Sequence, residues 1–345
     1  MCDFHAKTKT ENSFVLIERT PPVTETIIRM STLHIITPLF NPLRFKSRYN
    51  LYNQFEQMVL QQPDVILTTV EVAFGDRPFH VTTKNNLRHV QLRTYDEIWT
   101  KESSINLGLQ HTLQIYPEAE YFAWIDADVF FMNPNWVKET IEQLQHFMFV
   151  QMFSHAVDFG PNMEFIQKQN GFVYSYHQNG MVVPPQDFSY GGVISQYGFW
   201  HPGYAWAARR EALDMVGGLI DYAILGAGDH HMSLAMVGEV QRSFPTGISQ
   251  GYANQLRVWQ SRCERKIKRD IGFVNGTLGH NFHGKKKDRR YSERWKILTD
   301  NNYDPNTDIL RDSQGLITLD RQDFRLRDEM RLYFRARNED SVDLE

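Results

Sequence analysis

The sequence has few cysteines and no long apolar run. Cys2 and Cys263 are its 2 cysteines, which excludes a disulfide framework and a cysteine-rich zinc site. No run of about 18 apolar residues occurs, so no transmembrane helix is predicted. Residues 1–30 carry charges throughout. We therefore expect no signal peptide or anchor, and a cytoplasmic protein of bacterial or viral origin.

A strong charge of one sign is also lacking. Lys and Arg number 37 against 41 Asp and Glu, which gives a net charge of -4 and argues against nucleic acid as a partner. Internal repeats and low-complexity tracts are absent as well. Hydrophobic residues make up 41% and charged residues 23%, as in an ordinary ordered globular protein. The aromatic content of 13% suits either a core or a sugar-binding cleft.

Short apolar strands alternate with amphipathic helices in the first half of the chain. This alternation predicts an α/β fold with a mostly parallel central sheet and helices on both faces. Ligands of such sheets bind at the carboxyl ends of the strands. The predicted strands are 33–38, 65–74 and 121–131, and the predicted helices are 45–59, 101–115 and 135–147.

The remaining segments are less regular. Residues 1–30 are predicted to be an N-terminal arm, 31–300 the main domain, and 301–345 a C-terminal extension that ends in a surface helix. Residues 153–199 are rich in Gly, Asn, Gln and Tyr and are expected to form a long loop or hairpin insertion, which in a compact domain is usually functional. Further predicted strands are 203–208 and 271–278, and further predicted helices are 209–216, 254–268 and 288–298.

Asp126-Ala127-Asp128 at the end of an apolar strand is the strongest local signal. Buried carboxylates need a partner, and a divalent cation whose other positions are taken by substrate phosphates would satisfy both acids. The alternative is a structural turn at the end of the strand. We favour a metal site.

Two other motifs are less specific indications of a functional site. Gly226-Ala227-Gly228-Asp229-His230-His231 heads a predicted helix. Asp229 there can be a general base, but a plain N-cap is the simpler interpretation of this motif alone. His280 and His283 can ligate a metal or lie on the surface, and the basic run that begins at Lys285 can form a solvated helix face or a phosphate clamp.

Taken in order, these motifs resemble nucleotide-sugar glycosyltransferases of the GT-A fold, most closely the inverting β-1,4-galactosyltransferase-like type, over residues 32–300. The matching segments are TPLFNPLR (37–44), KESSINLGL (101–109), WIDADVFF (124–131), the run 203–232 and GHNFHG (279–284). In place of further acids of that family, this chain has His230 and His231.

The resemblance implies a set of site residues. It makes Asp229 the catalytic base and Asp128 a metal ligand, with Asp126 on donor hydroxyls or on the metal. His280 or His283 would complete the metal site, with His283 slightly less favoured. Donor contacts are expected from Thr37, Pro38, Arg44, Glu71, Arg77, Lys101, Asn106 and Lys285, and acceptor contacts from Trp200, Tyr204, Trp206 and His230.

The resemblance also implies a reaction. A sugar would pass from a nucleoside diphosphate donor to a hydroxyl of a glycan or other acceptor, with inversion at the anomeric carbon. The resemblance favours UDP as the nucleotide. Mn²⁺ or Mg²⁺ would neutralise the leaving diphosphate. The insertion 153–199 would recognise the acceptor or close as a lid that excludes water.

Three other functions compete with this interpretation. A nucleotidyltransferase would carry a Gly-rich loop after the first strand, where this chain has TPLFNPLR without glycine. A zinc hydrolase would use His230, His231, His280 and His283 together. A carbohydrate-binding protein without activity would use the acids for structure alone.

Overall fold

The computed structural model describes residues 31–182, 200–320 and 324–344. The predicted N-terminal arm and the second part of the predicted insertion lie outside these residues. The described part from Ser31 onward forms one compact unit.

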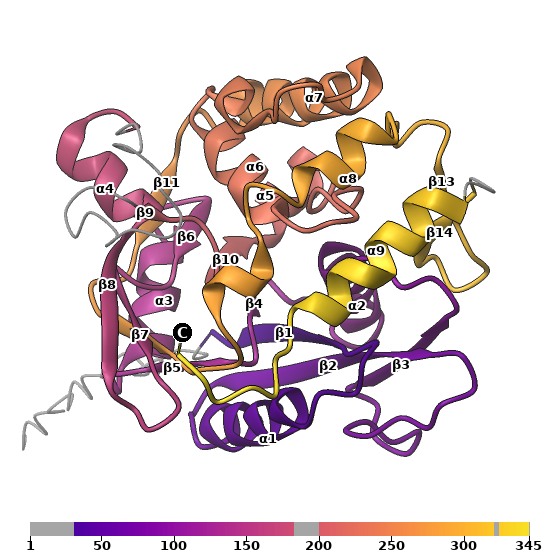
Figure 1. Ribbon diagram of the computed structural model, residues 1–345. Coiled ribbons are helices and arrows are strands. Elements are labelled where there is room, and N and C mark those ends of the chain that lie inside the picture. The colour runs from indigo at the N-terminus through magenta and orange to yellow at the C-terminus, as the bar shows by residue number, and fades with distance from the viewer. Residues whose placement is uncertain (1–30, 183–199, 321–323, 345) are drawn as a thin grey trace, which may run out of the picture. The chain divides into compact units, whose positions relative to one another are not determined.

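A central seven-stranded sheet organises this unit, in the order β11-β6-β10-β4-β1-β2-β3 (Figure 1). β1 pairs in parallel with β2 and β4, whereas β10 runs antiparallel between β4 and β6. The predicted α/β class with a mostly parallel sheet is therefore confirmed. The strands are β1 (Leu33–Phe40), β2 (Val65–Phe74), β3 (His89–Thr94), β4 (Tyr121–Ile125), β6 (Phe149–Gln151), β10 (Ala205–Arg209) and β11 (Ile271–Phe273).

Helices cover both faces of this sheet because alternate strand residues are buried on opposite sides. Leu33 and Ile35 of β1 pack toward α1 (Lys46–Leu60) and α3 (Trp136–Leu144). Ile36 packs on the other face. The helices on that second face are α2 (Lys101–Ile115), α5 (Arg210–Val216), α6 (Gly228–Met236), α7 (Gln250–Lys266), α8 (Trp295–Asp300) and α9 (Phe324–Ala336).

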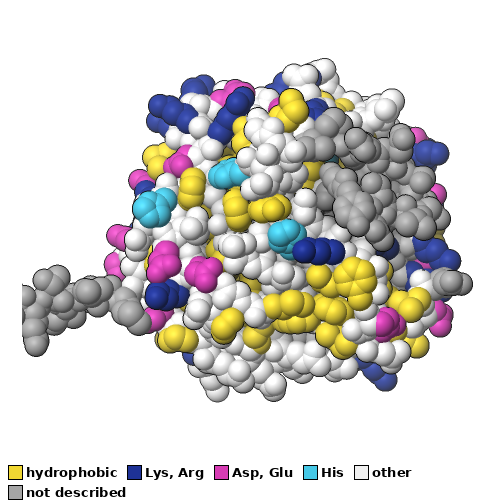
Figure 2. All heavy atoms as spheres, turned by 90° about the vertical axis from the view of Figure 1, so that its left-hand side faces the viewer, with side chains coloured by type: hydrophobic (Ala, Val, Ile, Leu, Met, Phe, Trp, Pro, Cys, Tyr) yellow, Lys and Arg dark blue, Asp and Glu magenta, His cyan; other side chains and the backbone are white. Residues whose placement is uncertain are grey.

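A second sheet, in the order β5-β12-β7-β8-β9, begins where the predicted strand 121–131 divides. The chain turns at Asp126–Asp128, so that the segment makes β4 and then β5 (Val129–Phe131) instead of one strand. The other members are β7 (His155–Phe159), β8 (Phe165–Gly171), β9 (Trp200–His201) and β12 (Thr277–His280). On the face shown in Figure 2 hydrophobic side chains form a band, and Phe165 and Ile166 of β8 are exposed.

The described first part of the insertion forms the hairpin β7–β8 and then α4 (Phe172–Asn179), so of the two predicted forms, loop or hairpin, this part takes the hairpin. One other prediction differs from the structure. The predicted helix 288–298 is broken, since Arg290 has a φ of 46° and separates the 3-10 turn Lys286–Arg289 from α8. The other 3-10 turn is Val240–Ser243, and β13 (Ile309–Arg311) pairs with β14 (Ile317–Leu319).

No helix in the described ranges is both long enough and apolar enough to cross a bilayer.

Close contact between α2 and the sheet gives a stability prediction. A Cβ on Gly108 would lie 2.6 Å from Ile36 Cγ2 and 2.8 Å from Val70 Cγ2. Gly108→Ala should therefore lower the free energy of unfolding by about 1–2 kcal/mol, because overpacking against two β-branched side chains outweighs the gain in helix propensity. Urea unfolding measures this, with the exposed Gln110→Ala on the same helix as control. A more stable Gly108→Ala protein would contradict this packing.

Candidate active site

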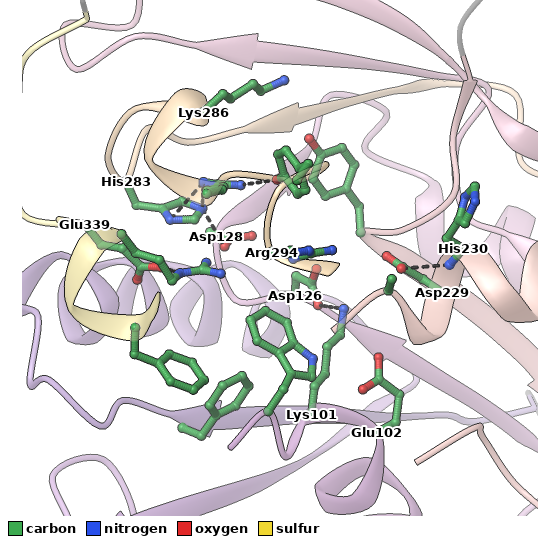
Figure 3. A pocket seen from close by; sticks show the side chains of 18 of the residues that line it. Lys101, Glu102, Asp126, Asp128, Asp229, His230, His283, Lys286, Arg294 and Glu339 are labelled. Carbon is green, nitrogen blue, oxygen red and sulfur yellow. Dashed lines mark hydrogen bonds and ion pairs between the residues drawn. The ribbon is translucent and has the colours of Figure 1, made fainter. Parts of the chain in front are cut away.

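A cavity of about 710 Å³ opens at the carboxyl ends of β1 and β4. Its lining comes from segments far apart in the sequence: the end of β1, the start of α2, the turn at Asp126–Asp128, the start of α6, and the stretch from His280 to Glu339. Figure 3 draws 18 of the lining side chains and labels ten of them, which lie around one space.

Three side chains in the cavity form a candidate metal centre. One ligand atom each from Asp128, His280 and His283 lies within 4.8 Å of the others, and all three residues are buried. His283 Nε2 is 3.0 Å from Asp128 Oδ2, and His280 Nε2 is 3.1 Å from His283 Nε2. Strand pairing explains the meeting: β12 runs antiparallel to β5 and places His280 opposite Val129, next to Asp128.

A second layer of contacts orients these ligands. β12 also pairs with β7, with Asp158 opposite His280, and the two side chains are 2.8 Å apart between His280 Nδ1 and Asp158 Oδ1. The Tyr204 hydroxyl donates to the same oxygen at 2.9 Å, and Lys286 donates to the other oxygen. A carboxylate behind a histidine is the usual support of a metal ligand. It leaves Nε2 of His280 to face the cavity.

Polar atoms in the triad fit a cation. Oδ1 of Asp128 is buried and has no hydrogen-bond partner among the residues that the structure describes, which is costly for a carboxylate. Burial, together with Arg289 and Arg48, lowers the pKa of His283 well below its ordinary value, so this imidazole is in the neutral form that binds metals. Two imidazoles and one carboxylate suit a first-row ion such as Mn²⁺ better than Mg²⁺, which prefers oxygen ligands.

Asp126 has a different partner from Asp128. Its Oδ1 is 2.6 Å from Lys101 Nζ, and within the described residues it is not part of the metal group. Burial raises the pKa of Asp126, against the effect of Lys101. Both residues line the cavity where donor contacts were predicted.

Asp229 begins α6 and faces the cavity (Figure 3). Its Oδ1 accepts a hydrogen bond from the His230 backbone N–H at 2.8 Å. Its Oδ2 lies against Gly203, where a Cβ would be only 2.1 Å away. Burial alone would raise the pKa of Asp229, but Lys101 and His201 lower it below the ordinary value. The side chain is therefore an ionised carboxylate that can accept a proton from a bound hydroxyl.

Two buried arginines in the cavity have no carboxylate partner. Arg289 and Arg294 are each 8% exposed. Arg289 contacts His283 and the Tyr291 hydroxyl, Arg294 contacts the Tyr333 hydroxyl, and neither forms an ion pair within the described residues. Nε of Arg289 has no hydrogen-bond partner in the described part of the chain. The two guanidinium groups together make a site for an anion.

Several predicted donor residues lie outside the cavity and support the fold. Thr37 donates to the Ile125 carbonyl at 3.0 Å. Glu71 accepts hydrogen bonds from the backbone N–H groups of residues 80–82 and so anchors a loop. Asn106 contacts Leu219 and Asp221. The structure therefore gives these polar groups partners within the protein.

Other predicted residues also fall outside the cavity lining. Arg77 donates to the Pro42 carbonyl, and Arg44 lies in a turn with a φ of 61°. Lys285 is 3.7 Å from Asp343, whereas its neighbour Lys286 lines the cavity.

Among the predicted acceptor residues, Tyr204 and His230 line the cavity. Trp200 is buried and stacks on His230, and Trp206 is a core residue whose Nε1 donates to the Pro202 carbonyl. Pro38 lines the cavity as predicted.

The four-histidine site of a zinc hydrolase is not assembled. His231 is fully buried between Ser243 and Tyr252, and His230 stacks on Trp200, while His280 and His283 belong to the group with Asp128. The second histidine pair is therefore separate from the candidate metal centre.

Residues 76–189 match the sequence profile of the galactosyl transferase GMA12/MNN10 family. This stretch contains Lys101, Asn106, Asp126 and Asp128 and ends before Asp229 and His280. The chain is a glycosyltransferase. The predicted enzyme class of a glycosyltransferase and the predicted mostly parallel central sheet are confirmed at this level.

Similar solved structures are distant from this glycosyltransferase. A β-1,4-galactosyltransferase 7 from Drosophila, determined with manganese, UDP-Gal and xylobiose, is 14% identical, with 87% of this chain and 99% of that chain covered and a TM-score of 0.38. A mannosyltransferase from Pyrobaculum calidifontis, with GDP-Man and Mn²⁺, is 15% identical, with coverages of 60% and 52% and a TM-score of 0.34. TM-scores this low add nothing to the assignment. No curated protein matches the chain.

Exchange of a single acid tests the metal centre. Asp128→Asn should weaken Mn²⁺ binding by more than about 100-fold, because the loss of a charged ligand exceeds the usual effect of a supporting residue. Isothermal titration calorimetry measures this, with Asp126→Asn as the matched control that keeps Mn²⁺ affinity. The opposite pattern would place the cation on Asp126.

Glu102 gives a prediction about pH. It lines the cavity next to Gly228, and burial, with Asp229 and Asp126 nearby, raises its pKa to about 8 against the effect of Lys101. The native protein then holds a proton that the unfolded chain releases above pH ~4.3, so stability should fall as pH rises from about 5 to 8.

Glu102→Gln should remove this loss, which can approach about 1.4 kcal/mol per pH unit. Urea unfolding of the metal-free protein at pH 5, 6, 7 and 8 measures the difference from the wild type. The exposed Glu118→Gln serves as control. A wild-type profile parallel to that of Glu102→Gln would show that Glu102 is ionised in the native state.

Proposed function

We propose that this glycosyltransferase moves a hexosyl group from a nucleoside diphosphate donor to a hydroxyl of a glycan or related acceptor. The description of the matched family favours galactose, and UDP is the proposed nucleotide. Mn²⁺ is the proposed cation, held by Asp128, His280 and His283.

One observation carries the proposal: the metal triad shares its cavity with two buried guanidinium groups that have no carboxylate partner among the described residues. Three half-buried cations of the same lining, by contrast, each have an acid as partner. Lys101 pairs with Asp126, Lys286 with Asp158, and Arg48 with Asp128 and Glu339. A diphosphate supplies the missing anion and also binds a divalent cation.

The leaving diphosphate gains negative charge as its bond to the sugar breaks. The bound cation would act as a Lewis acid that stabilises this charge. Arg289 contacts His283 at 2.8 Å, so its guanidinium can hold a phosphate oxygen next to the metal. Because these donors are already in place and buried, they need no reorganisation during the reaction.

The cavity lining includes an apolar and a polar group of side chains. Near the end of β1, Phe40, Phe45 and Trp99 supply apolar faces, and Phe40 and Trp99 pack edge to face at 4.9 Å. These rings suit a nucleoside base. Thr246, Lys296 and Thr299 also line the cavity, and these polar groups suit a hydroxylated acceptor.

Asp229 is the proposed general base. It is ionised, buried and faces the cavity, so it can take the proton of an acceptor hydroxyl as that oxygen attacks the anomeric carbon. In direct attack the acceptor oxygen approaches the anomeric carbon from one side while the diphosphate leaves from the opposite side. This displacement inverts the anomeric configuration.

A thermal-shift titration with UDP, GDP, CDP and dTDP, each with and without Mn²⁺, tests the donor site. A ligand at about 100 times its Kd stabilises the native state by about 2.7 kcal/mol. We expect UDP to raise the melting temperature only when Mn²⁺ is present. No shift with any nucleotide, together with a shift with zinc alone, would overturn the proposal in favour of a hydrolase.

Asp229→Asn tests the base. Donor binding should be unchanged while kcat falls about 10²–10⁴-fold, because general-base assistance is lost. Binding is measured by the thermal shift and transfer by product formation, with the exposed Asp214→Asn as control. Proton NMR of the first product formed reads its anomeric configuration. Near-wild-type transfer or a retained configuration would remove Asp229 from this role.

A further inference from the structure

The C-terminal segment Arg337–Ser341 lies against the metal centre, although it is far from Asp128 in the sequence. Glu339 is 4% exposed and lines the cavity. Arg48 of α1 lies between Glu339 and the metal triad. Its Nε and Nη2 donate to the two carboxylate oxygens of Glu339, and its Nη1 donates to Asp128 Oδ2 at 3.0 Å.

All three nitrogens of the Arg48 guanidinium donate hydrogen bonds in this arrangement. Two parallel hydrogen bonds to one carboxylate fix the plane of the group, and the remaining nitrogen then points at Asp128. Because Arg48 occupies Oδ2, the unpartnered Oδ1 of Asp128 is the oxygen left for a cation. Arg337 Nε also donates to Glu339 Oε1, at 2.6 Å, so Glu339 balances two positive charges next to a site that must accept a third cation.

The segment is held in place from two sides. Asp340 accepts hydrogen bonds from the backbone N–H groups of Lys46 and Ser47 at 3.0 and 2.8 Å, and so caps α1, whose own N-cap residue Phe45 makes no side-chain cap. In Figure 1 the yellow chain leaves α9 and passes α1.

On the other side, the segment lies on the residue that follows His283. A Cβ on Gly284 would be 2.9 Å from the Asn338 carbonyl oxygen and 3.0 Å from Glu339 Cα. The segment therefore contacts α1, which carries Arg48, and the loop that carries His283.

We propose that the C-terminal segment is a working part of the metal centre, with Glu339 as a positioning residue that acts on Asp128 through Arg48. This inference rests on the metal site of the proposed function. It assigns to residues 337–341 a role in cation affinity rather than in folding alone.

The test compares Mn²⁺ affinity in the full-length wild type, Glu339→Gln and Asp343→Asn. The EPR signal of free Mn²⁺ measures the affinity without any assay of transfer. Glu339→Gln should bind Mn²⁺ about 10–100-fold more weakly, the usual effect of losing a group that supports a metal ligand. Asp343→Asn makes the same chemical change at an exposed position of the same tail and should bind like the wild type.

Arg48→Lys is the second variant, because Glu339→Gln leaves two buried arginines unbalanced and can unfold the chain. Lysine keeps the positive charge but cannot bridge both carboxylates, so Arg48→Lys should also bind Mn²⁺ at least 10-fold more weakly, with the far-UV circular dichroism of a folded protein. Affinities within twofold of wild type in both variants would overturn the inference. A wild type that binds no Mn²⁺ would instead overturn the proposed metal site.

Discussion

The site depends on the pairing of one short strand with two neighbours. β12 lies between β5 and β7, and His280 is at its end. The antiparallel pairing brings His280 beside Asp128, and the parallel pairing brings Asp158 behind it. A shift of one residue would turn His280 to the opposite face of the sheet, so that both the ligand and its supporting carboxylate would be lost. The geometry of the metal centre therefore follows from strand register.

Charge balance is the second constraint on the cavity. Its buried acids and bases are paired closely enough that most of them cancel, which makes burial tolerable. Arg289 and Arg294 are exceptions, because their contacts are a histidine and tyrosine hydroxyls. Such excess positive charge beside a cation site would repel the metal by itself. A polyanionic ligand that contacts both would remove this conflict, and the diphosphate of the proposed donor is such a ligand.

Elements with a local sequence signal could be predicted from the sequence. Residues that only tertiary pairing brings to the site were missed. The helix 101–115 and the strand 65–74 match α2 and β2 residue for residue, because their apolar periodicity is clear. Asp158 was missed, since it lies in a stretch without periodicity that strand pairing orders. Arg48 and Glu339 were missed because they meet across nearly the whole chain. The donor contacts of Glu71 and Asn106 stay predictions, and in the structure both side chains have backbone partners.

The two acids of Asp126-Ala127-Asp128 have opposite electrostatic surroundings, and this difference suits them to different roles. Lys101 contacts Asp126, yet burial raises the pKa of that carboxyl. For Asp128 burial acts in the same direction, but the hydrogen bond with His283 and the positive charge of Arg48 hold the pKa well below its ordinary value. Asp128 therefore stays charged, which a cation requires. Asp126, which is paired with Lys101, is better suited to hydrogen bonds with hydroxyls of the proposed donor. The spacing of the acids is a sequence property, but their different roles come from the side chains that the fold places around each.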